Sequence, residues 1–280
     1  MLAIRKLDSE LNRRGLLSGQ VTLIPVVNAG AFRLGRRTGE DGLDLARTCP
    51  GRPDGTMTER LAHDLTTNYI HNADYYIDLH TGGLRLQVHP LCGYMLHPYP
   101  AVLERQRRMA RAFGLPIVWG TDPTLEGRTL SVARDANIPA IYAEYLGGGG
   151  CDPHGVDAYV RGCLNVLIDL GIIHGAPDPS VSPPLVIEDT RPNSGYLQIQ
   201  NPAPMDGFFE CAVKLGQRVR CGDRLGNVSD ALGAKRSLLT ADRDGIVLVA
   251  RSFASVETGD SVAVILETDA DPPAWRLDRP

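Results

Sequence analysis

Residues 73–83 read Ala73-Asp74-Tyr75-Tyr76-Ile77-Asp78-Leu79-His80-Thr81-Gly82-Gly83. The pattern predicts a short β-strand closed by a Gly-Gly turn, with Asp78 and His80 on one face at its carboxyl end. Open α/β sheets carry their chemistry at that edge. A histidine there, with a carboxylate two residues back to hold its tautomer, is a candidate metal ligand. The alternative is a strand-end histidine that only satisfies local hydrogen bonds.

The composition bounds the class of protein. With 280 residues, 43% hydrophobic and 22% charged, the chain has the make-up of a soluble globular protein. No run approaches the roughly 18 apolar residues of a membrane span, and charged residues interrupt the first 17 positions, so we expect a cytoplasmic protein without a membrane partner. The net charge of −4 and dispersed arginines argue against nucleic acid. Six scattered cysteines without C-x-x-C spacing indicate neither a zinc knuckle nor a disulfide framework.

Helical and strand patterns alternate through the first two thirds of the chain, which predicts an α/β domain with a mostly parallel sheet. Besides the opening strand, we expect helices at 2–17, from a capping box at Thr56–Glu59, at 101–113, 129–136 and 156–170. We expect strands at 21–27, 117–119 and 140–146, and a strand or hairpin at 91–97. Such domains usually begin on a strand, whereas this pattern opens with a helix.

A glycine- and charge-rich loop is predicted from Asn28 to Gly55. Arginine is spaced along it, at positions that include Arg36, Arg37 and Arg47. Because a guanidinium fork matches a carboxylate with two hydrogen bonds, the loop is a candidate binding site for an anionic group. A solvated loop without function is the alternative.

Glu144 lies near the end of the apolar strand predicted at 140–146, just before Gly147-Gly148-Gly149-Gly150. If the sheet is parallel, this carboxyl group points to the same edge as His80. A half-buried carboxyl group at such a position suits general acid/base work. The alternative is a glutamate that reaches water across the flexible glycines.

A proline-rich segment from His174 to Pro192 predicts a domain boundary, with domains at 1–176 and 192–280. Beyond it the pattern changes to short strands and tight turns. The motif V-x-x-G-D occurs twice, at Val219–Asp223 and Val256–Asp260. A small all-β domain with an internal two-fold repeat is therefore expected.

Residues 20–175 resemble the succinylglutamate desuccinylase/aspartoacylase family, zinc hydrolases whose fold is related to that of the zinc carboxypeptidases. The matching pieces, in the family's order, are 23–29 (LIPVVNA), Arg37, 44–51 (DLARTCPG), 58–62 (TERLA), 78–83 (DLHTGG) and 143–147 (AEYLG). Each piece alone is weak, but their order makes the match specific. The resemblance implies a zinc-carboxypeptidase-like domain that hydrolyses the amide bond of a small N-acyl amino acid.

The resemblance also implies roles for individual residues. His80 corresponds to the third zinc ligand and Glu144 to the glutamate that activates the metal-bound water. Arg37 corresponds to the arginine that polarises the scissile carbonyl. Arg47 corresponds to the arginine that grips a substrate carboxylate, and Arg36 and Asp44 are expected to bind substrate beside it.

The chain departs from the family's pattern in two places. Ala46 replaces the asparagine of the family's D-L-N-R motif, which shifts or loosens substrate preference. The family's first two zinc ligands come from an H-G-x-E segment before the first helix, and this sequence begins at that helix, so we expect an incomplete zinc site in an amino-terminally shortened chain. No other histidine is a convincing replacement: His63 and His71 fall on a predicted helix, His154 lies at the head of a late helix, and His89 and His97 follow the His80 turn and could approach it.

The carboxyl-terminal repeat resembles the barrel-sandwich fold of biotinyl and lipoyl carrier domains. Lys235 is the nearby lysine that a carrier would modify, but it lacks the flanking residues of either carrier motif. A scaffold, a lid or a homo-oligomer contact is the favoured role. The competing hypothesis for the whole chain is a metal-free, carboxylate-binding pseudoenzyme, and the sequence does not identify the acyl group or the amine of the substrate.

Overall fold

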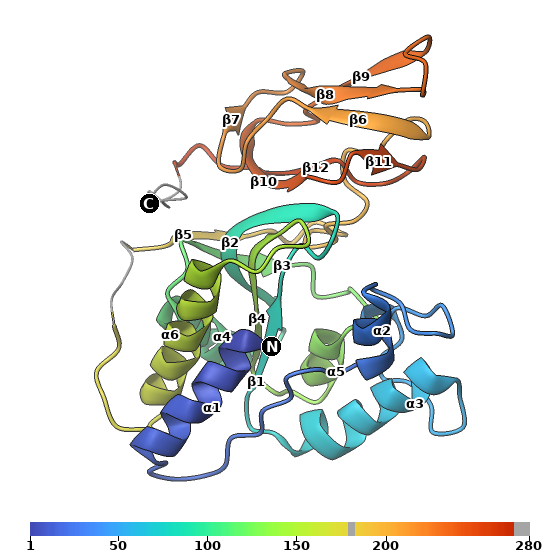
Figure 1. Cartoon of the computed structure of the whole chain (residues 1–280). Helices are drawn as coiled ribbons and strands as arrows, with labels where there is room; N and C mark the ends of the chain where they lie inside the picture. Colours follow the sequence, from blue (N-terminus) through green and yellow to red (C-terminus); the bar gives the residue numbers. More distant parts are fainter. Residues whose placement is uncertain (179–182, 272–280) are drawn as a thin grey trace. The chain divides into compact units, whose positions relative to one another are not determined.

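The computed structural model describes residues 1–178 and 183–271 (Figure 1). The helices are α1 (Leu2–Arg14), α2 (Ala29–Leu34), α3 (Met57–Asp64), α4 (Pro100–Phe113), α5 (Thr129–Asp135) and α6 (Pro153–Asp169), with short turns η1 (Leu45–Arg47), η2 (Leu65–Tyr69) and η3 (Ile70–Asn72). The first five strands are β1 (Tyr76–His80), β2 (Leu86–Met95), β3 (Ile117–Thr121), β4 (Ala140–Gly147) and β5 (Leu185–Glu188). The remaining strands are β6 (Gly207–Cys211), β7 (Arg218–Val219), β8 (Arg224–Ser229), β9 (Arg236–Thr240), β10 (Gly245–Arg251), β11 (Ser255–Val256) and β12 (Ala263–Leu266).

The described chain divides into two compact units, each of which is described by itself. Unit 1 holds residues 1–79, 92–143 and 153–193, and unit 2 holds residues 80–91, 144–152 and the chain from 194 onward. Strands β1, β2 and β4 therefore each contribute residues to both units. The domain boundaries predicted at 176 and 192 stay a prediction, and residues 179–182 of that linker lie outside the described part of the chain.

Unit 1 is an α/β unit, as the sequence predicted. Strands β1, β4, β2 and β3 are neighbours in that order, and β5 adds to β3 in parallel, with Ile117 opposite Leu185. Helix α6 packs against both α1 and α4, and the three lie side by side in Figure 1. Their contact is close at Gly162, where an added Cβ would lie 2.5 Å from Phe113 Cε1. The glycine at position 162 of α6 therefore leaves room for the Phe113 ring of α4, and this close contact fixes α4 against α6.

Unit 2 is mainly antiparallel β-structure. Strands β11, β6, β8 and β9 form one sheet in that order. Strand β10 pairs antiparallel with β12, with β7 and with the first residues of β2, where Val249 lies opposite Val88. The buried core of this unit includes Phe209, Leu225, Val247, Val262 and Ile265. The predicted sequence of an α/β domain followed by an antiparallel β-domain is confirmed.

The repeated V-x-x-G-D motifs form two turns of the same kind. In the first, Asp223 N donates to Arg220 O at 2.9 Å and Arg220 N donates back to the Asp223 carboxylate at 2.8 Å. In the second, Asp260 N donates to Glu257 O at 3.0 Å and Glu257 N donates to the Asp260 carboxylate at 3.1 Å. Both glycines are left-handed, with φ near +90°. The repeat therefore encodes a carboxylate-closed turn that only glycine fits at low cost.

One prediction about a strand is wrong. Residues 21–27 form no strand, and their apolar side chains are only partly covered. Pro25 lacks the N–H that a strand in mid-sheet must donate, so an apolar run alone was not sufficient. Strand β5 was not predicted, and it lies inside the proline-rich segment 174–192, where the sequence predicts a domain boundary. No helix in the described residues is long and apolar enough to cross a membrane.

Candidate functional site

The predicted arginine positions lie in unit 1, in residues 36–48, which we call the arginine loop. Arg37 Nε donates to Asp44 Oδ2 at 2.6 Å. The other oxygen of Asp44 accepts from Ala46 N at 3.0 Å and so begins the η1 turn that ends at Arg47. One carboxylate therefore fixes the direction of Arg37 and the start of the turn that carries Arg47.

Arg36 donates hydrogen bonds to two backbone carbonyls of the same loop. Its Nε donates to Thr38 O at 3.2 Å and its Nη2 to Gly39 O at 2.8 Å. A guanidinium that serves backbone carbonyls shapes the loop. Its predicted role in substrate binding stays a prediction.

The arginine loop is also tied to the beginning of α3 by Asp41. Its carboxylate accepts from Thr58 N at 2.8 Å, from Thr58 Oγ1 at 2.8 Å and from Leu43 N at 3.2 Å. These hydrogen bonds, that from Thr58 N foremost, hold the pKa of Asp41 well below its usual range. The carboxylate adds to the capping box of α3, in which Thr56 N donates to the Glu59 carboxylate at 2.7 Å, as the sequence predicted.

A polar cluster connects the arginine loop with β1. Thr129 Oγ1 donates to Asp78 Oδ2 at 2.6 Å. Tyr76 lies half-buried beside this pair, and desolvation, followed by the charge of Asp78, raises its pKa well above the ordinary value. Burial raises the pKa of the Cys49 thiol to about 12, and the charges of Asp78 and Asp44 add to that rise. Asp78 is therefore close to Cys49, the residue that follows the arginine loop. The thiol of Cys49 stays protonated at neutral pH.

His80 and Glu144 both belong to unit 2. Strands β1 and β4 are neighbours, and their hydrogen bonds advance together along both strands, from Tyr76 N to Pro139 O and from Gly82 N to Leu146 O. The two strands are therefore parallel, and Tyr76 pairs with Ala140.

Counting from that pair places His80 opposite Glu144. Strand β4 holds one residue more than β1 between the two hydrogen bonds, because it advances from 139 to 146 while β1 advances from 76 to 82. The extra residue is Leu146, whose φ of 47° marks a left-handed position after Glu144. The register is therefore unbroken up to Glu144, and opposite residues of parallel strands project to the same face. Glu144 is buried, with 9% of its surface exposed.

Glycines close the chain around this pair, and we call Gly82, Gly83 and Leu146–Gly149 the glycine rim. Its links are backbone hydrogen bonds: Gly149 N donates to Gly83 O at 2.8 Å, and Gly148 N donates to Leu86 O at 2.9 Å. An added Cβ would lie 2.2 Å from Leu86 O at Gly82 and 2.4 Å from it at Gly147. The rim therefore brings the ends of β1 and β4 closer together than side chains would allow.

The carboxyl-terminal chain of unit 2 also contacts this region. Ser252 N and Phe253 N both donate to Arg85 O, at 2.9 and 3.2 Å. Arg85 follows the rim by two residues, and its guanidinium lies 3.7 Å from the Asp260 carboxylate. Lys235 is exposed in a hairpin whose backbone Asp230 holds, and its carrier role stays untested.

His97 and His89, two other candidates for a metal ligand, both form hydrogen bonds with backbone groups. Both ring nitrogens of His97 serve the backbone: Nδ1 accepts from Tyr99 N and Nε2 donates to Arg134 O, each at 3.1 Å. His89 is buried, its Nδ1 donates to Pro90 O at 3.3 Å, and burial lowers its pKa to about 4. Across residues 1–178 and 183–271, no group of three or more His, Cys, Asp or Glu side chains is arranged to hold a metal ion.

Sequence reasoning missed several residues that shape these regions. Asp41 contacts Thr58, 17 positions away, and Thr129 contacts Asp78, 51 positions away. The signal for Asp41 was its place between two glycines, Gly39 and Gly42, in a loop that needed an anchor. No local pattern pointed to Thr129. The roles of Arg37, Arg47, His80 and Glu144 stay predictions.

Comparisons with known proteins support the fold described above. Residues 1–169 match the catalytic domain described as succinylglutamate desuccinylase/aspartoacylase. The N-alpha-acetyl-L-2,4-diaminobutyric acid deacetylase of Halomonas elongata is 34% identical over 279 residues, which cover 95% of this chain and 77% of that protein. A succinylglutamate desuccinylase/aspartoacylase from Rhodobacter sphaeroides superposes with a TM-score of 0.81 at 28% identity, covering 94% of this chain and 81% of that one. A product-bound ectoine utilization protein from Ruegeria pomeroyi superposes with a TM-score of 0.82 at 26% identity, covering 94% and 79%.

Proposed function

This chain belongs to the succinylglutamate desuccinylase/aspartoacylase family, a family of zinc-dependent amidohydrolases, and we propose that it removes the acyl group from a small N-acyl amino acid. N-α-acetyl-L-2,4-diaminobutyrate is the first substrate to test, because the Halomonas relative is named for it. The observation that carries the proposal is the register of β1 and β4, which places His80 opposite Glu144 at the carboxyl ends of two parallel strands.

The proposed binding roles follow the arginine loop. Arg47 takes the substrate carboxylate, since a guanidinium binds a carboxylate with two parallel hydrogen bonds. Arg37 donates to the scissile carbonyl and stabilises the oxyanion that develops on it. Asp44 orients Arg37 through the 2.6 Å ion pair and sets the turn of Arg47. Arg36 supports both by fixing the backbone between them.

Glu144 is the proposed proton carrier. It takes a proton from the attacking water as the carbon–oxygen bond forms, and it returns that proton to the nitrogen as the carbon–nitrogen bond breaks. Its burial favours this role, because a proton held by a carboxyl group that is shielded from bulk water is not readily lost to solvent.

A catalytic zinc site takes three protein ligands and an open position. In the described residues, His80 is the one side chain that the family resemblance assigns to zinc, and these residues complete no such group. We therefore assign no step to the metal.

The substitution Glu144→Gln tests the proposal. It keeps the shape of the side chain and removes its basicity, so we expect kcat to fall about 10³-fold, or about 4 kcal/mol in barrier, with little change in KM. Acetate release from N-α-acetyl-L-2,4-diaminobutyrate and from a panel of N-acetyl and N-succinyl amino acids provides the measurement. Glu104→Gln, a change of an exposed glutamate on α4, is the matched control.

Metal content of the purified protein decides between two forms of the proposal. Stoichiometric zinc together with hydrolysis of one panel member supports the deacylase. A protein without metal that hydrolyses no panel member but is thermally stabilised by N-acyl amino acids is instead a carboxylate-binding pseudoenzyme. Equal rates for wild type and Glu144→Gln would remove Glu144 from the mechanism.

A further inference from the structure

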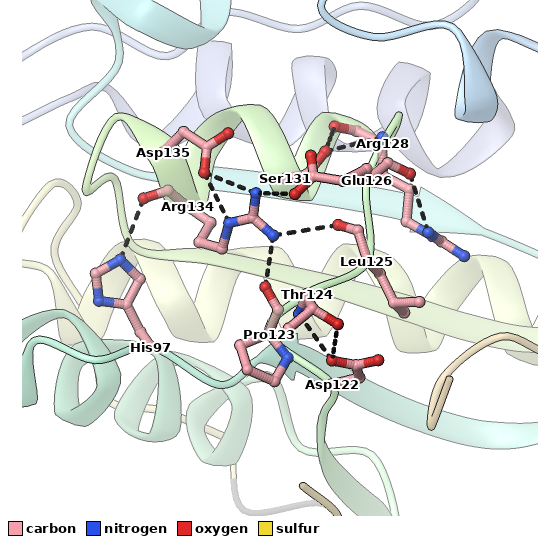
Figure 2. A network of polar contacts seen from close by, with 10 residues as sticks. All are labelled: His97, Asp122, Pro123, Thr124, Leu125, Glu126, Arg128, Ser131, Arg134 and Asp135. Atoms are coloured by element: carbon pink, nitrogen blue, oxygen red, sulfur yellow. Dashed lines mark hydrogen bonds and ion pairs between the residues drawn. The ribbon is translucent and has the colours of Figure 1, made fainter. Parts of the chain in front are cut away.

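The segment between β3 and α5, residues 122–128, is held in unit 1 by the guanidinium of Arg134 (Figure 2). Arg134 Nη1 donates to the carbonyl oxygens of Pro123 and Leu125, and its Nη2 contacts the Glu126 carboxylate at 2.7 Å. Only 12% of the Arg134 side chain is exposed. A partly buried guanidinium that serves three loop residues at once fixes the path of the loop.

Both ends of this segment are fixed as well. Asp122 Oδ1 accepts from Thr124 N and Oγ1, each at 2.7 Å, and its Oδ2 accepts from Asn193 N at 2.6 Å. At the other end Arg128 N donates to Ser131 Oγ at 2.9 Å in the first turn of α5. The whole segment is therefore rigid where it precedes α5, with few torsions left free.

Gly127 brings this segment against the turn that carries Arg47. Its carbonyl accepts from Cys49 N at 3.1 Å. Its missing side chain leaves room for the backbone of Arg47, since an added Cβ would lie 2.8 Å from Arg47 O and 3.0 Å from Arg47 C. Its φ is +78°, a left-handed value that also favours glycine.

We propose that the segment 122–128, clamped by Arg134, is a positioning element for Arg47, and that Gly127 is its point of contact. The inference rests on the proposed function in one respect, because it takes Arg47 as the residue that binds the substrate carboxylate. Gly127 and Arg134 touch no substrate: they act by fixing the backbone position from which the Arg47 side chain extends. Their loss therefore weakens carboxylate recognition and leaves proton transfer at Glu144 unchanged.

The substitution Gly127→Ala provides the test. We expect KM for N-α-acetyl-L-2,4-diaminobutyrate to rise about tenfold while kcat stays within about twofold, since a displacement of about 1 Å suffices for such losses. The preference for the free acid over the corresponding primary carboxamide, measured as a ratio of kcat/KM, should fall by a similar factor. A general loss of folded protein lowers both rates equally and leaves this ratio unchanged.

Gly171→Ala is the matched control. Gly171 has a φ of +71°, but an added Cβ meets nothing within 4 Å, so this variant imposes the same backbone strain without displacing a neighbour. It should keep the acid-to-carboxamide ratio of the wild type. Arg134→Lys is the second variant. An ammonium keeps the charge but cannot contact the carbonyls of Pro123 and Leu125 and the carboxylates of Glu126 and Asp135 together, so the ratio should fall by about threefold with the fold intact.

The outcomes separate this inference from the proposed function. If the wild type hydrolyses the acid and Gly127→Ala keeps the wild-type ratio, or Gly171→Ala loses it equally, the inference fails and the function stands. If the wild type does not hydrolyse but binds the N-acetyl acid in calorimetry, and Gly127→Ala weakens that binding about tenfold while Gly171→Ala does not, the inference stands and the function fails. A wild type that neither hydrolyses nor binds the acid overturns both.

Discussion

The arginine loop and the glycine rim are built in different ways. Carboxylates and guanidinium groups hold the loop: Asp44 fixes Arg37, Asp41 ties it to α3, and Arg36 serves its carbonyls. The rim is held by backbone hydrogen bonds between segments that approach closely because glycines stand at the points of contact. The rim should therefore be sensitive to added volume and indifferent to pH, and the loop should behave in the opposite way.

The largest effect is expected from Gly147→Ala in the rim. Gly147 has a φ of +141°, and an added Cβ would lie 2.4 Å from Leu86 O and 2.8 Å from Gly82. Because backbone atoms cannot yield as a flexible side chain does, we expect a loss of about 3 kcal/mol in the free energy of unfolding. Urea titration followed by circular dichroism measures this loss.

Gly150→Ala is the control within the same run of glycines. An added Cβ there would meet only Gly147 O at 3.5 Å, an ordinary contact. This variant should stay within about 0.5 kcal/mol of the wild type. Equal losses for the two variants would show that the rim is not close-packed at Gly147, and the contrast with the arginine loop would disappear.

His89 gives unit 2 one source of pH dependence, and it is not one of the residues of the glycine rim. Its ring is buried on β2 against Gly216, and burial lowers its pKa to about 4 from 6.5. The unfolded chain binds the proton more readily, so stability is fully present above about pH 6.5 and falls as pH drops toward about 4. The shift corresponds to about 3 kcal/mol.

The variant His89→Gln should remove most of this loss. Its free energy of unfolding, measured by urea titration between about pH 7 and pH 4, should change less with pH than that of the wild type. His63→Gln is the control, because His63 is partly exposed on α3 and its replacement should leave the wild-type slope. Parallel slopes for the wild type and His89→Gln would mean that another group sets the pH dependence.

Much of the fold was predictable, because its signals are local. The period of Leu7 and Leu11 predicted α1, and the Gly-Gly turn after His80 marked the end of β1. The apolar run at 21–27 predicted a strand that the structure does not contain, since hydrophobicity alone does not distinguish a strand from an irregular segment whose side chains are half-buried. Strand β5 was hidden because a four-residue edge strand with Val186 exposed carries little pattern.

The candidate site was only partly predictable, for a related reason. Family motifs pointed to Arg37 and Asp44, but their ion pair depends on a turn that no periodicity describes. The contact of Gly127 with Arg47 joins positions 80 residues apart. Such contacts follow from the packing of elements, and a single sequence records them only as an isolated glycine.

The smallest effect is expected from Asp41→Asn in the arginine loop. The amide cannot reproduce all three hydrogen bonds that the carboxylate accepts from Thr58 and Leu43, so we expect the melting temperature at pH 7 to fall by a few degrees. Because the folded-state pKa of Asp41 is depressed, its stabilisation is present above the unfolded pKa near 3.8 and is lost as pH falls below that value. The gap in melting temperature between wild type and variant should therefore be constant from about pH 7 to pH 5 and narrow toward about pH 3.

Glu40→Gln, an exposed change in the same loop, should melt with the wild type at every pH. A gap that persists unchanged at pH 3 would show that shape, and not charge, makes Asp41 hold the loop, and the two regions would then be built alike.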